Sequence, residues 1–83
     1  MSDFEEFVKV LASIKDKSLL EDFLLGITTP NERREFGRRL EIVKRLLDKE
    51  PQHAIAKELG VGIATVTRGS KELTAGRFKF LRK

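Results

Sequence analysis

Apolar residues recur along most of the chain at the three- and four-residue spacing that places them on one face of a helix. The first such stripe follows Ser2, a residue type that favours the N-cap position, and consists of Phe4, Phe7, Val8, Leu11 and Ile14. A second helix is expected to begin at Ser18, another candidate cap, and to end at Gly26. Six large apolar residues lie in or beside it: Leu19, Leu20, Phe23, Leu24, Leu25 and Ile27.

This second stretch is too apolar for a chain of 83 residues, which forms one small domain with a high ratio of surface to volume. One face of such a domain can hardly bury all six side chains. The surplus favours a subunit interface, and from this stretch alone an ordinary core helix is an equal alternative.

The longest expected helix begins with the run Thr29-Pro30-Asn31-Glu32. Thr29 suits the N-cap, Pro30 the first helical position, and Glu32 the third, where it completes a capping box. The helix should continue to about Asp48, with an apolar stripe of Phe36, Leu40, Val43, Leu46 and Leu47. Its polar surface is strongly basic, with Arg33, Arg34, Arg38, Arg39, Lys44 and Arg45.

The stretch Gln52–Leu73 predicts two short helices joined by a turn. Pro51 suits the first turn of the first helix, and Gly60 is expected to end it. Ala56 is small at the point where the second helix must cross the first. This arrangement is a helix-turn-helix motif, with the inward positions taken by Ile55, Leu59, Val61 and Val66.

The second motif helix presents mostly small, hydroxyl-bearing and basic residues on its outer side: Ile63, Ala64, Thr65, Thr67, Arg68 and Lys71. Side chains of these types suit the DNA major groove. On the inner side, Gly69 stands one turn after Val66, where such a motif normally buries an aliphatic side chain. A hole in the inner face of this helix is therefore expected.

The net charge of +4 is unevenly distributed. Residues 1–30 carry three lysines against six acidic residues, whereas residues 31–83 carry fourteen basic against seven acidic residues. A basic region of this kind attracts polyanions. On charge alone a merely solvated surface is an equal alternative, but the coincidence with the helix-turn-helix favours nucleic acid.

Other chemistries find little support. There is no cysteine, and His53 is the only histidine, so neither a catalytic set nor a metal-ligand spacing is present. We therefore expect neither an enzyme nor a metal site. No apolar run approaches the roughly 20 residues of a membrane span, and the first residues lack the basic start of a signal peptide. We expect a soluble, cytoplasmic protein.

The run GVGIATVTRGS (Gly60–Ser70), preceded by TTPNERREFGRRLEIVKRLL (Thr28–Leu47), closely resembles the Trp repressor family of bacterial transcription regulators, which is a standard example of helix-turn-helix docking on DNA. The resemblance covers roughly Leu24–Leu73. It implies an all-α helix-turn-helix domain that forms an intertwined homodimer and represses transcription at double-stranded operator DNA. One domain, 1–83, would contain dimerisation helices over 1–48, the motif over 51–73 and a short basic segment over 74–83.

The resemblance also implies that L-tryptophan acts as a corepressor and raises operator affinity. In the family the indole lies between two arginines, and the matching positions here are Thr29, Arg39, Thr65, Arg68 and Gly69. An arginine plane can stack on an indole, and a guanidinium can pair with a carboxylate. Glu72 stands where a serine helps to hold the ligand's amino group, so its carboxylate either holds that ammonium or repels the ligand's own carboxylate. The alternative is that both arginines face phosphate and that Gly69 lets two helices approach closely.

For DNA, the expected base-edge residues are Ile63, Ala64 and Thr67, and Lys71 is expected to contact phosphate. The first motif helix begins differently from the family, with a shorter connection before it, and its candidate contacts are Gln52, His53 and Lys57. The last segment, 74–83, is either a truncated final helix or a loose arm.

Two other functions remain open. One is a ligand-independent DNA-binding module, such as a regulator without a corepressor or a fragment of a recombination protein. The joint presence of Thr29, Arg39, Arg68 and Gly69 speaks against it. The other is a helical protein-interaction module. The apolar second helix fits that function, but it does not explain the outward-facing residues Ile63, Ala64, Thr65 and Thr67.

Overall fold

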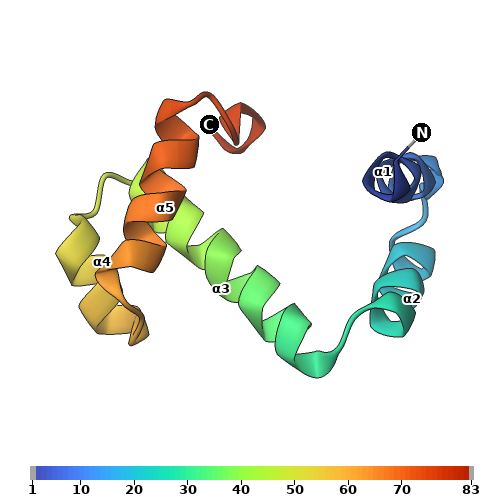
Figure 1. Cartoon of the computed structure of the whole chain (residues 1–83), viewed down its shortest axis with the longest axis horizontal. Helices are drawn as coiled ribbons and strands as arrows, with labels where there is room; N and C mark the ends of the chain where they lie inside the picture. The colour runs from blue at the N-terminus through green and yellow to red at the C-terminus, as the bar shows by residue number, and fades with distance from the viewer. Residues whose placement is uncertain (1, 83) are drawn as a thin grey trace. The chain divides into compact units, whose positions relative to one another are not determined.

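The computed structural model describes residues 2–82. Within this range the chain forms five α-helices, one short 3-10 helix and no strand (Figure 1), which confirms the all-α fold class. The helices are α1 (Asp3–Ser13), α2 (Lys17–Ile27), α3 (Pro30–Leu47), α4 (Gln52–Leu59), α5 (Ile63–Thr74) and the 3-10 helix η1 (Lys79–Leu81). They divide into two compact units, Met1–Arg33 and Arg34–Lys83.

Short polar side chains fix the starts of α1 and α2. The Ser2 hydroxyl accepts the Glu5 amide at 3.1 Å, and the Glu5 carboxylate accepts the Ser2 amide at 3.0 Å, so the predicted cap is confirmed. The two hydrogen bonds to Ser2, the backbone one first, hold the pKa of Glu5 below its usual value. For α2 the prediction was wrong: the cap is Asp16, whose carboxylate accepts the Leu19 amide at 3.0 Å, and Ser18 lies inside the helix.

The end of α2 also differs from the prediction. Gly26 remains helical, and the helix ends after Ile27, with Thr28 as the C-cap. The Thr28 amide donates to the carbonyl of Leu24 at 3.1 Å. The Arg33 guanidinium donates to the Thr28 carbonyl at 2.8 Å. The helix ends because the backbone of Thr28 is extended, with φ −116° and ψ 154°, and it needs no glycine at its C-terminus.

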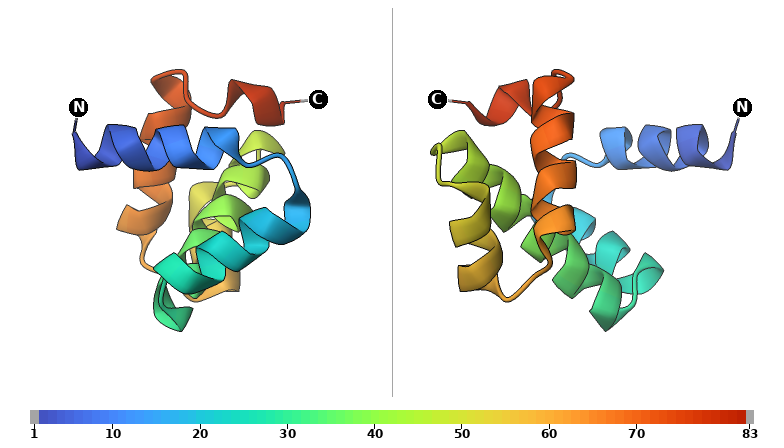
Figure 2. Two further views of the ribbon diagram at one scale, coloured as in Figure 1. Left: turned by 90° about the vertical axis from the view of Figure 1, so that its right-hand side faces the viewer. Right: turned by 60° about the vertical axis from the view of Figure 1, so that its left-hand side comes forward.

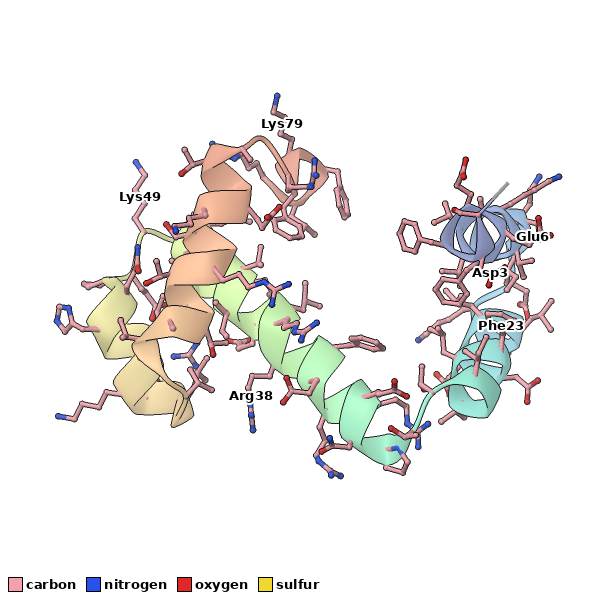
Figure 3. All side chains as sticks on the ribbon, in the orientation of Figure 1. Asp3, Glu6, Phe23, Arg38, Lys49 and Lys79 are labelled. Carbon is pink, nitrogen blue, oxygen red and sulfur yellow. The ribbon has the colours of Figure 1, made fainter. Side chains whose placement is uncertain are left out.

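Neither α1 nor α2 contains a buried residue. The aromatic rings of Phe7 and Phe23 are stacked, with centroids 6.2 Å apart; Phe23 is labelled in Figure 3. Large apolar side chains of this unit remain exposed: Phe4, Val8, Leu19, Leu25 and Ile27. The first unit therefore has no hydrophobic core of its own.

The predicted capping box at the start of α3 is confirmed. The Thr29 hydroxyl accepts the Glu32 amide at 3.1 Å, and the Glu32 carboxylate accepts the Thr29 amide at 2.8 Å. The pKa of Glu32 is lowered chiefly by the hydrogen bond from the Thr29 backbone and next by that of its side chain. Pro30 is the first helical residue, as expected.

The second unit holds the core, where α3 packs against α4 and α5 (Figure 2). Ile42, Ile55, Ala56 and Val66 are buried together, and Leu46, Leu59 and Val61 pack around them. All four inward positions predicted for the motif belong to this cluster. Ile42 was missed, and Phe36 and Leu40 of the predicted stripe are 51% and 49% exposed.

Arg45 ties α3 to α4. Its Nε donates to Glu41 Oε2 at 2.9 Å, and its Nη1 lies 2.9 Å from Glu58 Oε1 and 3.8 Å from Glu50 Oε1. The hydrogen bond from Arg45 lowers the pKa of Glu41. Arg45 was predicted as part of a basic surface, and the structure instead places it in an ion-pair network that fixes the first motif helix.

Gly60 makes the turn of the motif, as predicted. Its backbone is left-handed, with φ 67° and ψ 36°, a conformation that glycine adopts without steric cost. The Val61 amide then donates to the Ala56 carbonyl at 3.0 Å, which is a Schellman closure of α4. The sequence predicted Pro51 in the first turn of α4. It is instead the N-cap, and the helix begins at the next residue, Gln52.

The last segment is neither a truncated α-helix nor a loose arm. Turns at residues 75–78 lead into η1, and two residues in them have positive φ, Gly76 at 98° and Phe78 at 65°. The Arg77 amide donates to the Glu72 carbonyl at 3.0 Å, and their side chains form an ion pair at 3.4 Å. The segment is thereby folded back beside the end of α5.

Candidate DNA-binding surface and ligand cavity

The seven residues predicted to contact DNA lie on the two motif helices: Gln52, His53 and Lys57 on α4, and Ile63, Ala64, Thr67 and Lys71 on α5. Five of them are exposed, including the large apolar Ile63, whose exposed fraction is 50%. Gln52 and Thr67 are half-buried. Exposed apolar and basic side chains on one helix-turn-helix suit a nucleic-acid surface.

Gln52 and Thr67 are half-buried next to each other. The Thr67 hydroxyl donates to Gln52 Oε1 at 2.8 Å, which links the start of α4 to the middle of α5. This bond occupies the carbonyl end of the Gln52 side chain, and the two N–H donors lie at the other end of the same amide. The pairing was not visible in the sequence because the two residues are fifteen positions apart.

A cavity of about 260 Å³ lies between α3 and α5 within the second unit. It brings together five of the six predicted ligand residues: Arg39, Thr65, Arg68, Gly69 and Glu72. The sixth, Thr29, belongs to the first unit, where its hydroxyl caps α3. Its role in ligand binding stays a prediction.

Sequence reasoning missed four residues that also line this cavity: Glu35, Ile42, Val43 and Phe78. The three on α3 lie three or four residues from Arg39, so helical periodicity around Arg39 could have found them. Phe78 carries no such signal, because it reaches the cavity through a turn with a left-handed backbone.

The cavity carries both signs of charge beside apolar side chains. Arg39 lies 4.0 Å from Glu35, and Arg77 lies 3.4 Å from Glu72. The side chain of Arg39 is 59% exposed, so this pair is well solvated and weak. A guanidinium in a weak pair can exchange its partner for a ligand carboxylate, which it binds through two parallel hydrogen bonds.

A Cβ atom added at Gly69 would lie 3.4 Å from Ile42 Cγ2 and from Leu46 Cδ1, which is ordinary van der Waals contact. The space in front of this glycine therefore accepts one methyl group and is bounded by α3. Gly69 also lines the cavity. Both uses expected for this space, a bound ligand and close helix packing, stay predictions.

Residues 2–82 contain no group of three or more histidine, cysteine or carboxylate side chains arranged to hold a metal ion. None of the helices in that range is long and apolar enough to cross a membrane.

Comparison with known proteins adds to this geometry. The family model described as Trp repressor protein matches residues 2–82, almost the whole chain. The chain belongs to the Trp repressor family. The resemblance first noted over residues 24–73 thus extends to both ends of the described range.

Curated relatives agree with this assignment to the Trp repressor family. A Trp operon repressor homolog of Vibrio campbellii is 42% identical over 72 residues, which are 86% of this chain and 72% of the relative. One from Actinobacillus succinogenes is 39% identical over 74 residues, 88% of this chain and 73% of the relative. Because the family consists of transcription regulators, the protein is a DNA-binding repressor and not an enzyme.

Proposed function

We propose that this member of the Trp repressor family binds operator DNA as a homodimer and that L-tryptophan acts as its corepressor. The observation that carries the proposal is the cavity between α3 and α5, which unites Arg39, Arg68 and Gly69. The relatives are bacterial, and bacterial chromosomal DNA lies in the cytoplasm, so this is where we propose that the protein acts.

The chemistry of the cavity suits an aromatic amino acid. A free amino acid carries one carboxylate and one ammonium, and the cavity offers the guanidinium of Arg68 for the first and the carboxylate of Glu72 for the second. Arg39 supplies a planar cation that can stack on an aromatic ring. Ile42 and Val43 add an apolar wall. A volume of about 260 Å³ favours a small ligand, since sites for drug-sized molecules start at roughly 300 Å³.

The ligand would act through α5, because this helix carries residues of both sites. Arg68 and Gly69 line the cavity, while Ile63 and Thr67 belong to the proposed DNA surface. A ligand packed between α3 and α5 would fix the tilt of α5 and thereby favour the orientation that fits the major groove. By linkage, operator DNA must then raise ligand affinity by the same factor as the ligand raises operator affinity.

Dimerisation through residues 1–48 is supported by the exposed apolar side chains of α1 and α2. In the second unit, Phe36 and Leu40 of α3 are also large apolar residues that are about half exposed. One helix-turn-helix reads one half-site, so a two-fold dimer would read two half-sites about one DNA turn apart.

We expect L-tryptophan to tighten operator binding and Arg68→Ala to remove most of this response. Loss of the hydrogen-bonded charge pair between Arg68 and the ligand carboxylate should weaken tryptophan binding by about 1.5–3 kcal/mol. Operators can be selected from a random duplex library with millimolar L-tryptophan present, and affinities then measured with and without it at fixed salt. Calorimetric titration gives ligand affinity directly. Arg39→Ala should weaken tryptophan binding as well, and Arg38→Ala is its matched control, because Arg38 is the neighbouring arginine on α3 and does not line the cavity.

Equal operator affinity with and without tryptophan would favour the ligand-independent regulator. In that case calorimetry with tryptophan should also show no heat of binding, and Arg39 and Arg68 would contact DNA phosphate.

For DNA contacts, we expect Lys71→Ala to weaken binding to all sequences alike. One phosphate contact fewer should reduce the slope of log affinity against log salt by about one unit. Ile63→Ala should instead change which sequences are selected, because a base-edge residue carries sequence information. Salt titrations of both variants on selected and random duplexes separate the two roles. An unchanged selection with Ile63→Ala would contradict the assignment of Ile63.

A further inference from the structure

Phe78 lies outside the helix-turn-helix, in the turn that precedes η1. It nevertheless lines the candidate cavity together with residues of α3 and α5. Its backbone is left-handed, with φ 65° and ψ 19°. This conformation is unfavourable for a residue with a Cβ atom. Strained residues of this kind persist where their surroundings fix them, and they cluster at ligand clamps.

Several contacts fix this turn from both sides. Before Phe78, the Gly76 amide donates to the Leu73 carbonyl and the Arg77 amide to the Glu72 carbonyl, each at 3.0 Å. The ion pair between Arg77 and Glu72 adds a side-chain contact, and Glu72 itself lines the cavity. After Phe78, the Leu81 amide donates to the Phe78 carbonyl at 3.0 Å. The turn is thus joined to the cavity wall at Glu72.

The same segment contains a second phenylalanine that is placed very differently. Phe80 is 85% exposed and does not line the cavity. Apolarity of the segment alone would not distinguish the two rings. Phe78 differs from Phe80 in its left-handed backbone and in its place in the lining of the cavity.

We propose that Phe78 is a specificity-determining residue for the corepressor. Its ring forms the third wall of the cavity and packs against the aromatic ring of an aromatic amino acid, so that ligand binding also holds residues 75–82 in place. This inference rests on the proposed function, because it needs a ligand in the cavity. The chemical class selected is an aromatic zwitterion, since aromatic pairs gain stability beyond simple burial.

The test compares two phenylalanine variants of the full chain by calorimetric titration with L-tryptophan. Phe78→Ala should bind about tenfold more weakly than wild type, which corresponds to about 1.4 kcal/mol. Phe80→Ala, the same change two residues away, should bind within about twofold. Phe78→Gly removes the ring but suits the left-handed backbone. It should therefore weaken tryptophan binding as much as Phe78→Ala does, while the thermal midpoint stays at the wild-type value.

A second readout follows the segment itself. Trypsin cleaves after Arg77 and Lys79, on either side of Phe78, and saturating tryptophan should slow both cleavages in wild type. In Phe78→Ala the same degree of ligand saturation should leave the cleavage rates unchanged.

The outcomes separate this inference from the proposed function. If wild type and Phe78→Ala bind tryptophan equally, the role of Phe78 is wrong and the corepressor proposal stands. If wild type binds no aromatic amino acid, both are wrong. If Phe80→Ala weakens tryptophan as much as Phe78→Ala, the effect belongs to the whole segment and the specific role of Phe78 is also wrong.

Discussion

The thermal midpoint of this protein should rise with its concentration, by about 4 °C for each tenfold increase. The reason is that α1 and α2 contain no buried residue, while Phe4, Leu25 and other large apolar side chains are exposed. If a second copy covers these residues, folding and association become one equilibrium. The size of the shift follows from an unfolding enthalpy of about 0.7 kcal/mol per residue for a dimer of this chain.

Circular dichroism melts over about a hundredfold range of concentration, with sedimentation at the two ends, measure this effect. Leu25→Lys should give a monomer with a much lower midpoint, because it places a charge in the proposed interface. Glu21→Lys introduces the same side chain at an exposed polar position of α2 and should leave the dimer intact. A midpoint independent of concentration, with a monomer mass, would contradict the dimer.

A large effect is also expected at Gly69, where two substitutions of increasing size should act in opposite directions. In Gly69→Ala the new Cβ would make ordinary contacts, 3.4 Å from Ile42 Cγ2 and Leu46 Cδ1. The helix would gain up to about 1 kcal/mol, because alanine favours helices more than glycine does. We therefore expect unchanged or higher stability and retained tryptophan binding.

Gly69→Val should lose tryptophan binding altogether and about 1–3 kcal/mol of stability. Its two methyl groups would have to enter either the contact with α3 or the cavity, and both are occupied when ligand is bound. Urea unfolding and calorimetric titration of both variants test this pair. Full tryptophan affinity in Gly69→Val would mean that the ligand does not bind beside Gly69.

What could be predicted from the sequence was set by local interactions. The cap at Ser2 and the capping box at Thr29 depend on residues three positions apart, and the left-handed backbone of the turn requires Gly60. The motif core followed from helical periodicity. Ser18 failed as a cap because Asp16, two residues earlier, makes the competing hydrogen bond.

Features that depend on contacts distant in sequence could not be predicted. Ile42 is buried only because α4 and α5 pack on that side of α3. The sequence predicts Arg45 as a surface cation, because its ion pair with Glu58 exists only once α3 and α4 have packed together. Five of the helical residues that line the cavity were predicted through the family resemblance. Phe78 could not be predicted, because its place depends on a left-handed backbone that a phenylalanine rarely adopts.

Some residues that line the cavity belong to α5 and others do not, and this difference affects how such a repressor can evolve. Arg68 and Gly69 belong to α5, the helix that also carries Ile63, the proposed base-edge residue. On the proposed function, a substitution at Arg68 or Gly69 would therefore affect operator choice together with ligand choice. Val43 and Phe78 lie outside that helix. After a gene duplication, or in a laboratory library, changes at these two positions offer a route to sensing a new metabolite while the set of controlled promoters is inherited unchanged.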